Sequence, residues 1–305
     1  MSPKVYIIVL CYNGVELTLG CLESIEKQDY SNLELCVVDN GSTDGTVTIV
    51  SQKFPRAQWV LNQENLGYAK GNNRGIEYAF DAGAEAVFLI NNDTRLHETC
   101  VSNLINILQK NPQIGITGPM VYTWDGDRTI SSAGGVVDWH MADAANVGMG
   151  EKDGGQFPRR SVDFINGCGI MVTRDVIQKV GGLDPKFFMY WEETAWCLRV
   201  KKAGFEVYFE SAAVMEHKAP ILSDELGPTT LYYMTRNRFL FFYRHAPAFM
   251  KSIALARALK GALRGIGENR KAGKTAHAKA MQSALLHAIS GRWGYADPKI
   301  WLTNK

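Results

Sequence analysis

The chain has 305 residues and a formal net charge of +2, with 46% hydrophobic and 21% charged residues. These values are ordinary for a globular protein, and the small net charge argues against a protein built wholly around nucleic acid. The six cysteines stand singly, which disfavours a disulfide framework or a zinc site and favours a reducing compartment. Since the N-terminus has no signal-peptide layout and no window of about 18 residues is continuously apolar, we expect a cytoplasmic protein without a transmembrane helix.

Short apolar runs alternate with helical patterns in the first part of the chain. The predicted strands are Val5–Leu10, Leu33–Val38, Gln58–Leu61 and Ala86–Ile90. This alternation is typical of right-handed βαβ units on a mostly parallel sheet, which indicates an α/β protein. The glycines form neither a G-x-G-x-x-G nor a P-loop pattern, so a dinucleotide fold and a P-loop are disfavoured.

A polar turn, Asn91-Asn92-Asp93-Thr94, follows the last of these strands. Ligands of open α/β sheets gather at the carboxyl ends of strands, and the other predicted strands also end in polar clusters. Asp93 offers the hard oxygen ligands that suit Mg²⁺ or Mn²⁺, which would hold a diphosphate. The alternative is a turn in which Asp93 or Thr94 caps a helix near Leu96–Gln109.

The chain changes character after Asn111. Further strands are predicted over Ile114–Tyr122, Ser132–Val137, Phe205–Phe209 and Ala213–Met215, and the segment Asp163–Val172 is expected to return to the core. Residues 138–160 are rich in Gly, Ala, Asp and Met without a clear period, which predicts a long mobile loop. Such a loop is either a lid or a surface excursion.

An aromatic-rich loop precedes paired carboxylates, Glu192 and Glu193, at the start of a predicted helix. In the first turn, Glu193 would interact with the helix dipole, which favours the ionised form and suits a general base near neutral pH. The alternative interpretation is a capping acid in an exposed first turn.

The order and spacing of the polar segments resemble those of family 2 glycosyltransferases. The matching segments are Leu10-Cys11-Tyr12-Asn13-Gly14, residues 38–46, residues 65–75 and Asn91-Asn92-Asp93. The resemblance implies a GT-A fold, with a mostly parallel Rossmann-like sheet flanked by helices, and a nucleotide-sugar donor. It implies that Asp39 contacts the base and that Asn91–Asp93 stand at an Asp-x-Asp position, with Asn91 in place of the first acid. The donor-binding residues expected on this basis are Cys11, Tyr12, Asn13, Asp39, Asn65, Gly67, Lys70, Asn73, Asn91, Asn92 and Asp93.

The stretch from Leu183 to Arg199 resembles the family's Glu-Asp-x-Asp-[Trp/Leu]-Cys-Leu-Arg motif, whose first Asp acts as the catalytic base. Glu193 occupies that position, and Ala195 replaces the second Asp. The resemblance also implies that His217, after a predicted strand, is a metal ligand together with Asp93. An imidazole next to diphosphate oxygens is compatible with Mn²⁺.

Residues 229–245 predict an amphipathic helix in which aromatic residues alternate with arginines. Such a helix could face nucleic acid, a membrane interface or an anionic substrate, or it could pack on the core with a solvated basic edge. The segment Tyr232-Tyr233-x-x-Arg236-Asn237 also resembles the family, where this element closes over the diphosphate and acceptor. Arg236 or Arg238 would then offset the missing acid at Asn91. The expected acceptor or diphosphate residues are Trp191, Glu192, Arg236, Asn237 and Arg238.

The Ala-rich, basic tail from Ala248 to Gly294 predicts an appended helical hairpin with a break near Gly265-Ile266-Gly267. Its surface could touch the anionic inner face of a membrane and reach lipid-linked acceptors, and a dimer-forming or scaffold-covering pair is equally compatible. We expect a catalytic domain over residues 1–228, with nucleotide-sugar (1–110) and acceptor (111–228) halves, and a helical region over 229–305.

Together these features predict an inverting glycosyltransferase, dependent on Mn²⁺ or Mg²⁺, that moves a sugar from a nucleotide donor to a glycan or lipid-linked acceptor. The sequence resembles rhamnosyltransferases of bacterial surface polysaccharide assembly, so dTDP-rhamnose is the first expected donor and a UDP-sugar the next. The alternatives are a catalytically impaired nucleotide-sugar or glycan-binding module and a sugar nucleotidyltransferase. The latter should carry a Gly-rich, Arg-containing loop after the first strand, where this chain has Cys11-Tyr12-Asn13-Gly14.

Overall fold

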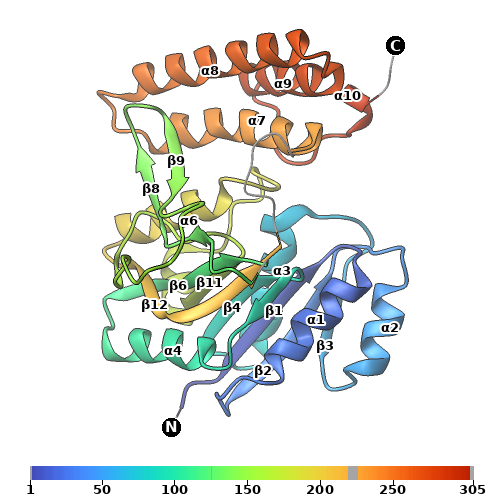
Figure 1. Cartoon of the computed structure of the whole chain (residues 1–305), viewed down its shortest axis with the longest axis vertical. Coiled ribbons are helices and arrows are strands. Elements are labelled where there is room, and N and C mark those ends of the chain that lie inside the picture. The colour runs from blue at the N-terminus through green and yellow to red at the C-terminus, as the bar shows by residue number, and fades with distance from the viewer. Residues whose placement is uncertain (1, 125, 219–225, 303–305) are drawn as a thin grey trace.

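The computed structural model describes residues 2–124, 126–218 and 226–302. Its main sheet is formed by β1 (Val5–Cys11), β2 (Leu33–Asp39), β3 (Gln58–Leu61), β4 (Ala86–Asn91), β5 (Thr94–Leu96), β6 (Ile114–Thr123), β7 (Ile130–Ser132), β10 (Arg160–Ser161), β11 (Gly169–Thr173) and β12 (Glu206–His217). The strand order is β10-β12-β6-β11-β4-β1-β2-β3, with β5 beside β12 and β7 beside β6 (Figure 1). The strands β1, β2, β3 and β4 are parallel to one another, as the apolar runs predicted.

The helices are α1 (Val15–Ile25), α2 (Thr46–Lys53), α3 (Gly67–Asp81), α4 (Cys100–Lys110), α5 (Arg174–Val180), α6 (Glu192–Lys202), α7 (Pro228–His245), α8 (Lys251–Lys271), α9 (Thr275–Ile289) and α10 (Lys299–Leu302). Successive side chains of a strand point to opposite faces of the sheet. Accordingly, Ile8 packs in one core with Ile76 of α3, and Ile7 packs in the other with Leu22 of α1. The cysteines are free and buried, as expected. Among the described residues, no helix is long and apolar enough to cross a membrane.

The polar turn after β4 does not cap a helix. Thr94–Leu96 form the strand β5, which pairs with β12 so that Thr94 lies opposite His217, and α4 begins only at Cys100. The capping alternative for Asp93 or Thr94 is therefore wrong. The strands predicted over 205–209 and 213–215 are likewise parts of one strand, β12, whose register shifts between Glu210 and Val214. The shift lies opposite Pro119 of β6, which has no backbone N–H to donate to the ladder.

Residues 138–160 are not the mobile loop that their composition predicted. The strands β8 (Gly135–Asp138) and β9 (Asp143–Asn146) form a hairpin that reaches the C-terminal helices (Figure 1). At its tip, the ring of Trp139 stacks on Phe241 of α7 with 6.1 Å between ring centroids, and Arg238 Nε donates to the carbonyl of Ala142 at 2.5 Å. Contacts with a distant helix thus order a segment that has no strong local pattern.

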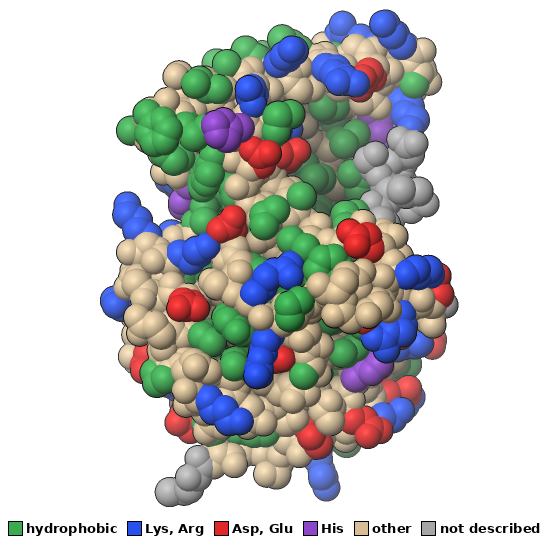
Figure 2. Space-filling model, turned by 60° about the vertical axis from the view of Figure 1, so that its left-hand side comes forward, with side chains coloured by type: hydrophobic (Ala, Val, Ile, Leu, Met, Phe, Trp, Pro, Cys, Tyr) green, Lys and Arg blue, Asp and Glu red, His purple; other side chains and the backbone are tan. Residues whose placement is uncertain are grey.

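The C-terminal helices α8 and α9 form the predicted hairpin, but the expected break at 265–267 is wrong. Helix α8 is continuous to Lys271, and the turn follows at Gly273. A Cβ atom on Gly265 would lie 2.5 Å from Met281 Cε, so this glycine allows α9 to approach α8 rather than ending the helix. In Figure 2, basic and hydrophobic side chains lie side by side over these helices, in the upper part of the view.

Two buried side chains of α7 fix the loop that precedes α6. Asn237 Nδ2 donates to the carbonyls of Phe187, Met189 and Tyr190 at 2.7, 2.8 and 3.0 Å. Arg236 donates from Nη1 to the carbonyl of Gly294 at 2.7 Å and from Nη2 to that of Phe187 at 3.1 Å. The exposed fractions of Arg236 and Asn237 are 1% and 0%, so neither is free to meet a solvent-borne ligand.

The loop needs this support because its backbone is strained. Phe188, Tyr190 and Trp191 have φ angles of 65°, 67° and 75°, in the left-handed region that side-chain-bearing residues rarely adopt. Each such residue costs on the order of 1–2 kcal/mol unless its surroundings hold it in place.

The substitution Asn237→Ala should therefore lower the free energy of unfolding by about 1–3 kcal/mol, because the loop loses three hydrogen bonds from a buried donor. Urea unfolding followed by circular dichroism would measure the loss. Asn103→Ala is the matched control, since Asn103 Nδ2 donates to one exposed carbonyl, that of Ala212 at 2.9 Å. Equal losses in the two variants would contradict a supporting role for Asn237.

Candidate functional site

The carboxyl ends of β1, β2 and β4 bring the first predicted residues together. In the parallel register Cys11 lies beside Asp39, and Leu10 lies beside Asn91. Cys11 Sγ donates to Asp39 Oδ1 at 3.5 Å, and the other oxygen of this buried carboxylate accepts from the backbone N–H groups of Gly41 and Ser42. These bonds fix the carboxylate of Asp39 at the carboxyl end of β2.

The loop after β1 is tied to the loop after β2. The backbone N–H of Asn13 donates to Ser42 Oγ at 2.7 Å, and Asn13 Oδ1 accepts from the N–H of Thr43 at 2.9 Å. Asn92 Nδ2 donates to the carbonyl of Asn13 at 3.1 Å, so this amide fastens the turn. Tyr12, between these anchored residues, is 52% exposed. The loops thus form one surface from which the ring of Tyr12 projects.

The start of α3 lies next to this surface. Asn65 Oδ1 accepts from the N–H of Gly67 at 2.9 Å, and Gly67 has no room for a side chain, since its Cβ would lie 2.5 Å from the carbonyl oxygen of Phe188. Lys70 is exposed and lines a cavity of about 450 Å³ together with Tyr12 and Asn65. Three of the residues predicted to bind the donor therefore line this cavity.

Asn73 differs from the prediction. Its Nδ2 donates to the carbonyl of Leu183 at 2.8 Å and its Oδ1 accepts from the N–H of the same residue at 2.9 Å. Both ends of the amide are used to attach the loop after α5 to α3. The structure thus gives Asn73 a positioning role instead of the expected donor contact.

Asp93 and His217, the predicted metal ligands, are in contact. His217 Nε2 lies 3.2 Å from Asp93 Oδ1, because β5 and β12 pair directly after the turn that carries Asp93. Burial opposes protonation of His217, but its contacts with Cys168 and Asp93 outweigh burial and raise its pKa to about 10. Burial likewise opposes ionisation of Asp93, yet the hydrogen bond from His217 lowers the pKa of this carboxyl. A cation bound here would displace the proton from His217.

The chemistry of this pair fits a divalent cation. A carboxylate oxygen and an imidazole nitrogen suit Mn²⁺, and the carboxylate also suits Mg²⁺. Among the described residues, no group of three or more His, Cys, Asp and Glu side chains could hold a metal on its own. Two protein ligands leave coordination positions for phosphate oxygens and water, which is how Mg²⁺ is commonly held with phosphorylated substrates.

The paired carboxylates begin α6, as predicted. Glu193 is half-buried, and its Oε1 accepts from Thr194 Oγ1 at 3.2 Å, whereas Glu192 is buried and its Oε2 has no hydrogen-bond partner. Burial raises the pKa of Glu193. Burial and the neighbouring charge of Glu193 raise the pKa of Glu192 well above its ordinary range. Glu193 is thus the better placed of the two to exchange a proton with a ligand.

The carboxylates of Glu193 and Asp93 belong to one region. After burial, the charges of Glu192, Glu193 and Asp93 contribute to raising the pKa of Tyr190. Gly167 lies next to Glu193, since a Cβ at this position would be at van der Waals distance, 3.5 Å, from Glu193 Cγ. The charges of the candidate base and of one candidate metal ligand thus act on the same phenol.

Apart from Glu192, the residues predicted to contact the acceptor or diphosphate bind or pack against other parts of the protein in this structure. Trp191 is buried against Phe241, with 4.9 Å between ring centroids. Arg236 and Asn237 bind backbone carbonyls, and Arg238 holds the tip of the β8–β9 hairpin. A sequence cannot distinguish an arginine that meets a phosphate from one that meets carbonyls, because both need the same donor group.

Some residues at the site were missed. Cys168 contacts His217, Tyr68 donates to the carbonyl of Gly167 beside Glu193, and the backbone N–H of Lys218 donates to the carbonyl of Asp93 at 3.1 Å. Tyr68 and Lys218 lie within or next to the segments that carry the family resemblance, which was the available signal. Cys168 lies within the segment Asp163–Val172, and no pattern in the sequence marked it as a site residue.

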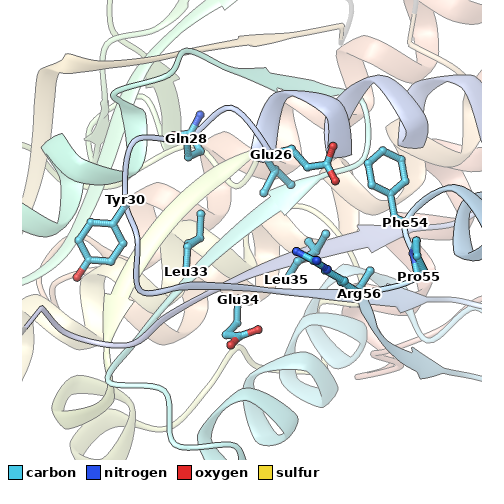
Figure 3. Close-up of a pocket in the computed structure, with 11 residues that line it drawn as sticks. Glu26, Gln28, Tyr30, Leu33, Glu34, Leu35, Phe54, Pro55 and Arg56 are labelled. Atoms are coloured by element: carbon cyan, nitrogen blue, oxygen red, sulfur yellow. The ribbon is translucent and has the colours of Figure 1, made fainter.

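A second cavity, of about 520 Å³, lies at the amino end of β2, and none of the predicted site residues lines it (Figure 3). Tyr30, Leu33, Phe54 and Arg56 are among its lining residues. Because ligands of open α/β sheets bind at the carboxyl ends of the strands, we assign the site to the opposite edge.

Two known proteins have a similar fold. A mannosyltransferase from Pyrobaculum calidifontis, solved with GDP-Man and Mn²⁺, aligns with a TM-score of 0.60 at 18% identity, over 96% of this chain and 87% of the other. GalNAc-T7, solved with UDP, GalNAc and Mn²⁺, aligns with a TM-score of 0.59 at 13% identity, over 84% of this chain and 54% of the other. These similarities confirm the GT-A fold.

Sequence comparisons identify the family. An N-acetylglucosaminyl-diphospho-decaprenol L-rhamnosyltransferase of Mycobacterium tuberculosis is 30% identical over 72% of this chain and 78% of its own length. A dTDP-rhamnosyl transferase of Shigella flexneri is 27% identical over 82% of this chain and 84% of its own. The family model for glycosyl transferase family 2 matches residues 6–181, more than half of the chain. The chain therefore belongs to glycosyl transferase family 2 and is similar to rhamnosyltransferases within it.

Proposed function

We propose that this glycosyltransferase is an inverting, metal-dependent enzyme that uses dTDP-rhamnose, or failing that a UDP-sugar, and acts on a glycan or lipid-linked acceptor in bacterial surface polysaccharide assembly. The observation that carries the proposal is the contact between Asp93 and His217 at the strand ends where the loops of Tyr12 and Asp39 converge. The names of the relatives from Mycobacterium tuberculosis and Shigella flexneri support a rhamnosyl donor and, for the first, a polyprenol-linked acceptor.

The proposed reaction is one displacement at the anomeric carbon of the donor sugar. Glu193 takes the proton of an acceptor hydroxyl, whose oxygen attacks the anomeric carbon from the face opposite the diphosphate. The bond from that carbon to the diphosphate oxygen breaks, and the nucleoside diphosphate leaves with the bonding electrons. Because one bond forms as the opposite one breaks, the anomeric configuration is inverted.

Asp93 and His217 would hold the divalent cation, and the rest of the crevice would hold the nucleoside. When bound, the cation supplies charge stabilisation for the leaving diphosphate. Asp39 and the loop of Asn13 are fixed by backbone hydrogen bonds, so they present a preformed surface to the base and ribose.

We further propose that α8 rests on an anionic bilayer when the acceptor is lipid-linked. The outward side chains of Ile253 and Leu263 are 48% and 55% exposed, and Phe249 just before the helix is 81% exposed. Lys260 and Lys271 are exposed on the same helix. Apolar side chains that enter the interface, flanked by lysines that meet anionic headgroups, are the composition of an interfacial helix.

The proposed metal site predicts cation-dependent binding of one nucleoside diphosphate. Calorimetric titration with dTDP, UDP and GDP, each with Mn²⁺ and with EDTA, should give tighter binding of dTDP in Mn²⁺. Asp93→Ala should abolish the difference between Mn²⁺ and EDTA, because it removes the carboxylate ligand. Asp29→Ala, a change of the same kind far from the crevice, serves as the control. A wild-type affinity that is the same in Mn²⁺ and EDTA would contradict the metal site.

The proposed base predicts a specific kinetic loss. Glu193→Gln keeps the shape of the side chain but cannot accept the proton, so kcat should fall by about 10²–10⁴ while dTDP affinity is retained. Glu193→Asp, which restores an ionisable carboxyl, should lose less. Undiminished turnover in Glu193→Gln would rule out this residue as the base.

The same assignment predicts the acid limb of the pH profile. Only the ionised form of Glu193 can act as the base, so kcat/KM should fall as the pH drops through the pKa of this carboxyl. Burial raises that pKa above 4.5, so the midpoint should lie above the value of an ordinary glutamate. A midpoint at or below 4.5 would contradict the assignment.

The membrane contact predicts binding to vesicles that contain phosphatidylglycerol. Reversing the charges of Lys260 and Lys271 by substitution with Glu should lower the partition coefficient in co-sedimentation by more than about tenfold. The control is the same charge reversal at Lys27, just after α1, and at Lys110, the last residue of α4. It should have little effect on vesicle binding. No binding by the wild type, or equal loss in both pairs, would contradict a docking role for α8.

A further inference from the structure

The cavity of about 450 Å³ beside Tyr12 is closed partly by residues far along the chain. Besides Tyr12, Asn65 and Lys70, it is lined by Phe188 from the loop before α6 and by Tyr295 from the segment after α9. The segments that carry the family resemblance thus supply only part of the wall, and the C-terminal region supplies the rest.

The backbone around Tyr295 is held by buried groups. The N–H of Gly294 donates to the carbonyl of Lys186 at 2.8 Å, and the carbonyl of Gly294 accepts from Arg236 Nη1 at 2.7 Å. On the other side, the N–H of Ala296 donates to the hydroxyl of Tyr233 at 3.0 Å. Tyr295 is therefore fixed by hydrogen bonds on both of its neighbours, and its position does not depend on its own side chain.

The ring of Tyr295 has few constraints of its own. It is 63% exposed, and its contact with Phe188 is edge-on, with 5.4 Å between ring centroids. A single exposed tyrosine needs no functional explanation. Tyr295 differs from a random surface residue because its rigid backbone directs it into the cavity that already contains Tyr12, another exposed aromatic residue, and Lys70.

We propose that Tyr295 forms an aromatic wall of the nucleobase pocket, so that the C-terminal region takes part in binding the nucleoside of the donor. The inference rests on the proposed function, since it assumes a nucleotide donor. Aromatic rings are suited to this role because each nucleobase has a flat face on which a ring can stack, whatever its hydrogen-bonding edge. Tyr295 would thus add affinity for the nucleoside through the flat face of its base.

Calorimetric titration with dTDP in Mn²⁺ tests the proposal on the full chain. Tyr295→Ala should weaken binding by about tenfold, the effect expected for loss of one stacking ring. Tyr295→Phe, which keeps the ring, should bind as the wild type does. Tyr243→Ala is the matched control, because Tyr243 is equally exposed, at 61%, but does not line the cavity. The unfolding temperature of each variant is measured in parallel.

The outcomes separate this inference from the function on which it rests. If the wild type binds none of dTDP, UDP and GDP in Mn²⁺, both proposals fail. If the wild type binds one of them and Tyr295→Ala binds it equally well, the function stands and the role of Tyr295 is overturned. A loss in Tyr295→Ala that comes with a lower unfolding temperature than that of Tyr243→Ala would also overturn it, because the segment itself would then be disturbed.

Discussion

The carboxamide of Asn237 is the interaction on which much of the site depends. It binds three carbonyls of a loop whose residues Phe188, Tyr190 and Trp191 adopt left-handed φ angles. That loop leads directly into α6 and sets the position of Glu193. Its Phe188 carbonyl also accepts from the N–H of Ala69, at the start of α3. One strained loop therefore connects α6, which carries the candidate base, with α3 and with α7. A shift of any of these helices would move the loop and, through it, the other two.

The balance of charge at the crevice follows from where the arginines are. A bound diphosphate needs positive charge, and Arg236 or Arg238 was expected to offset the acid missing at Asn91. Both instead bind backbone carbonyls. In the described parts of the chain, Lys70, Lys218 and the imidazole of His217 are cationic groups near the strand ends. The carboxylates of Asp93, Glu192 and Glu193 add negative charge to the same region. A divalent cation is therefore favoured as the main group that compensates the charge of the diphosphate.

Local patterns were sufficient for the parallel core and for the order of the loops around it. An apolar run such as Ala86–Ile90 can be buried on both faces only inside a sheet, and the resemblance placed Asp93 and His217 in one site before any pairing was known. What the sequence could not provide depended on contacts between distant segments. The β8–β9 hairpin is ordered by α7, Gly265 is explained by Met281, and Tyr295 reaches the cavity through bonds to Lys186 and Tyr233.

The structure offers a physical reason why Ala195 stands in place of the motif's second acid. Ala195 is 2% exposed and lies in the same hydrophobic cluster as Trp191. It also lies one helical turn after Glu192, whose buried Oε2 already has no partner. An aspartate at this position would add a third carboxylate to a desolvated pair, and like charges at short range raise the pKa of their neighbours. Alanine avoids this repulsion, so the departure from the motif favours the ionised form of Glu193, which proton transfer from an acceptor requires.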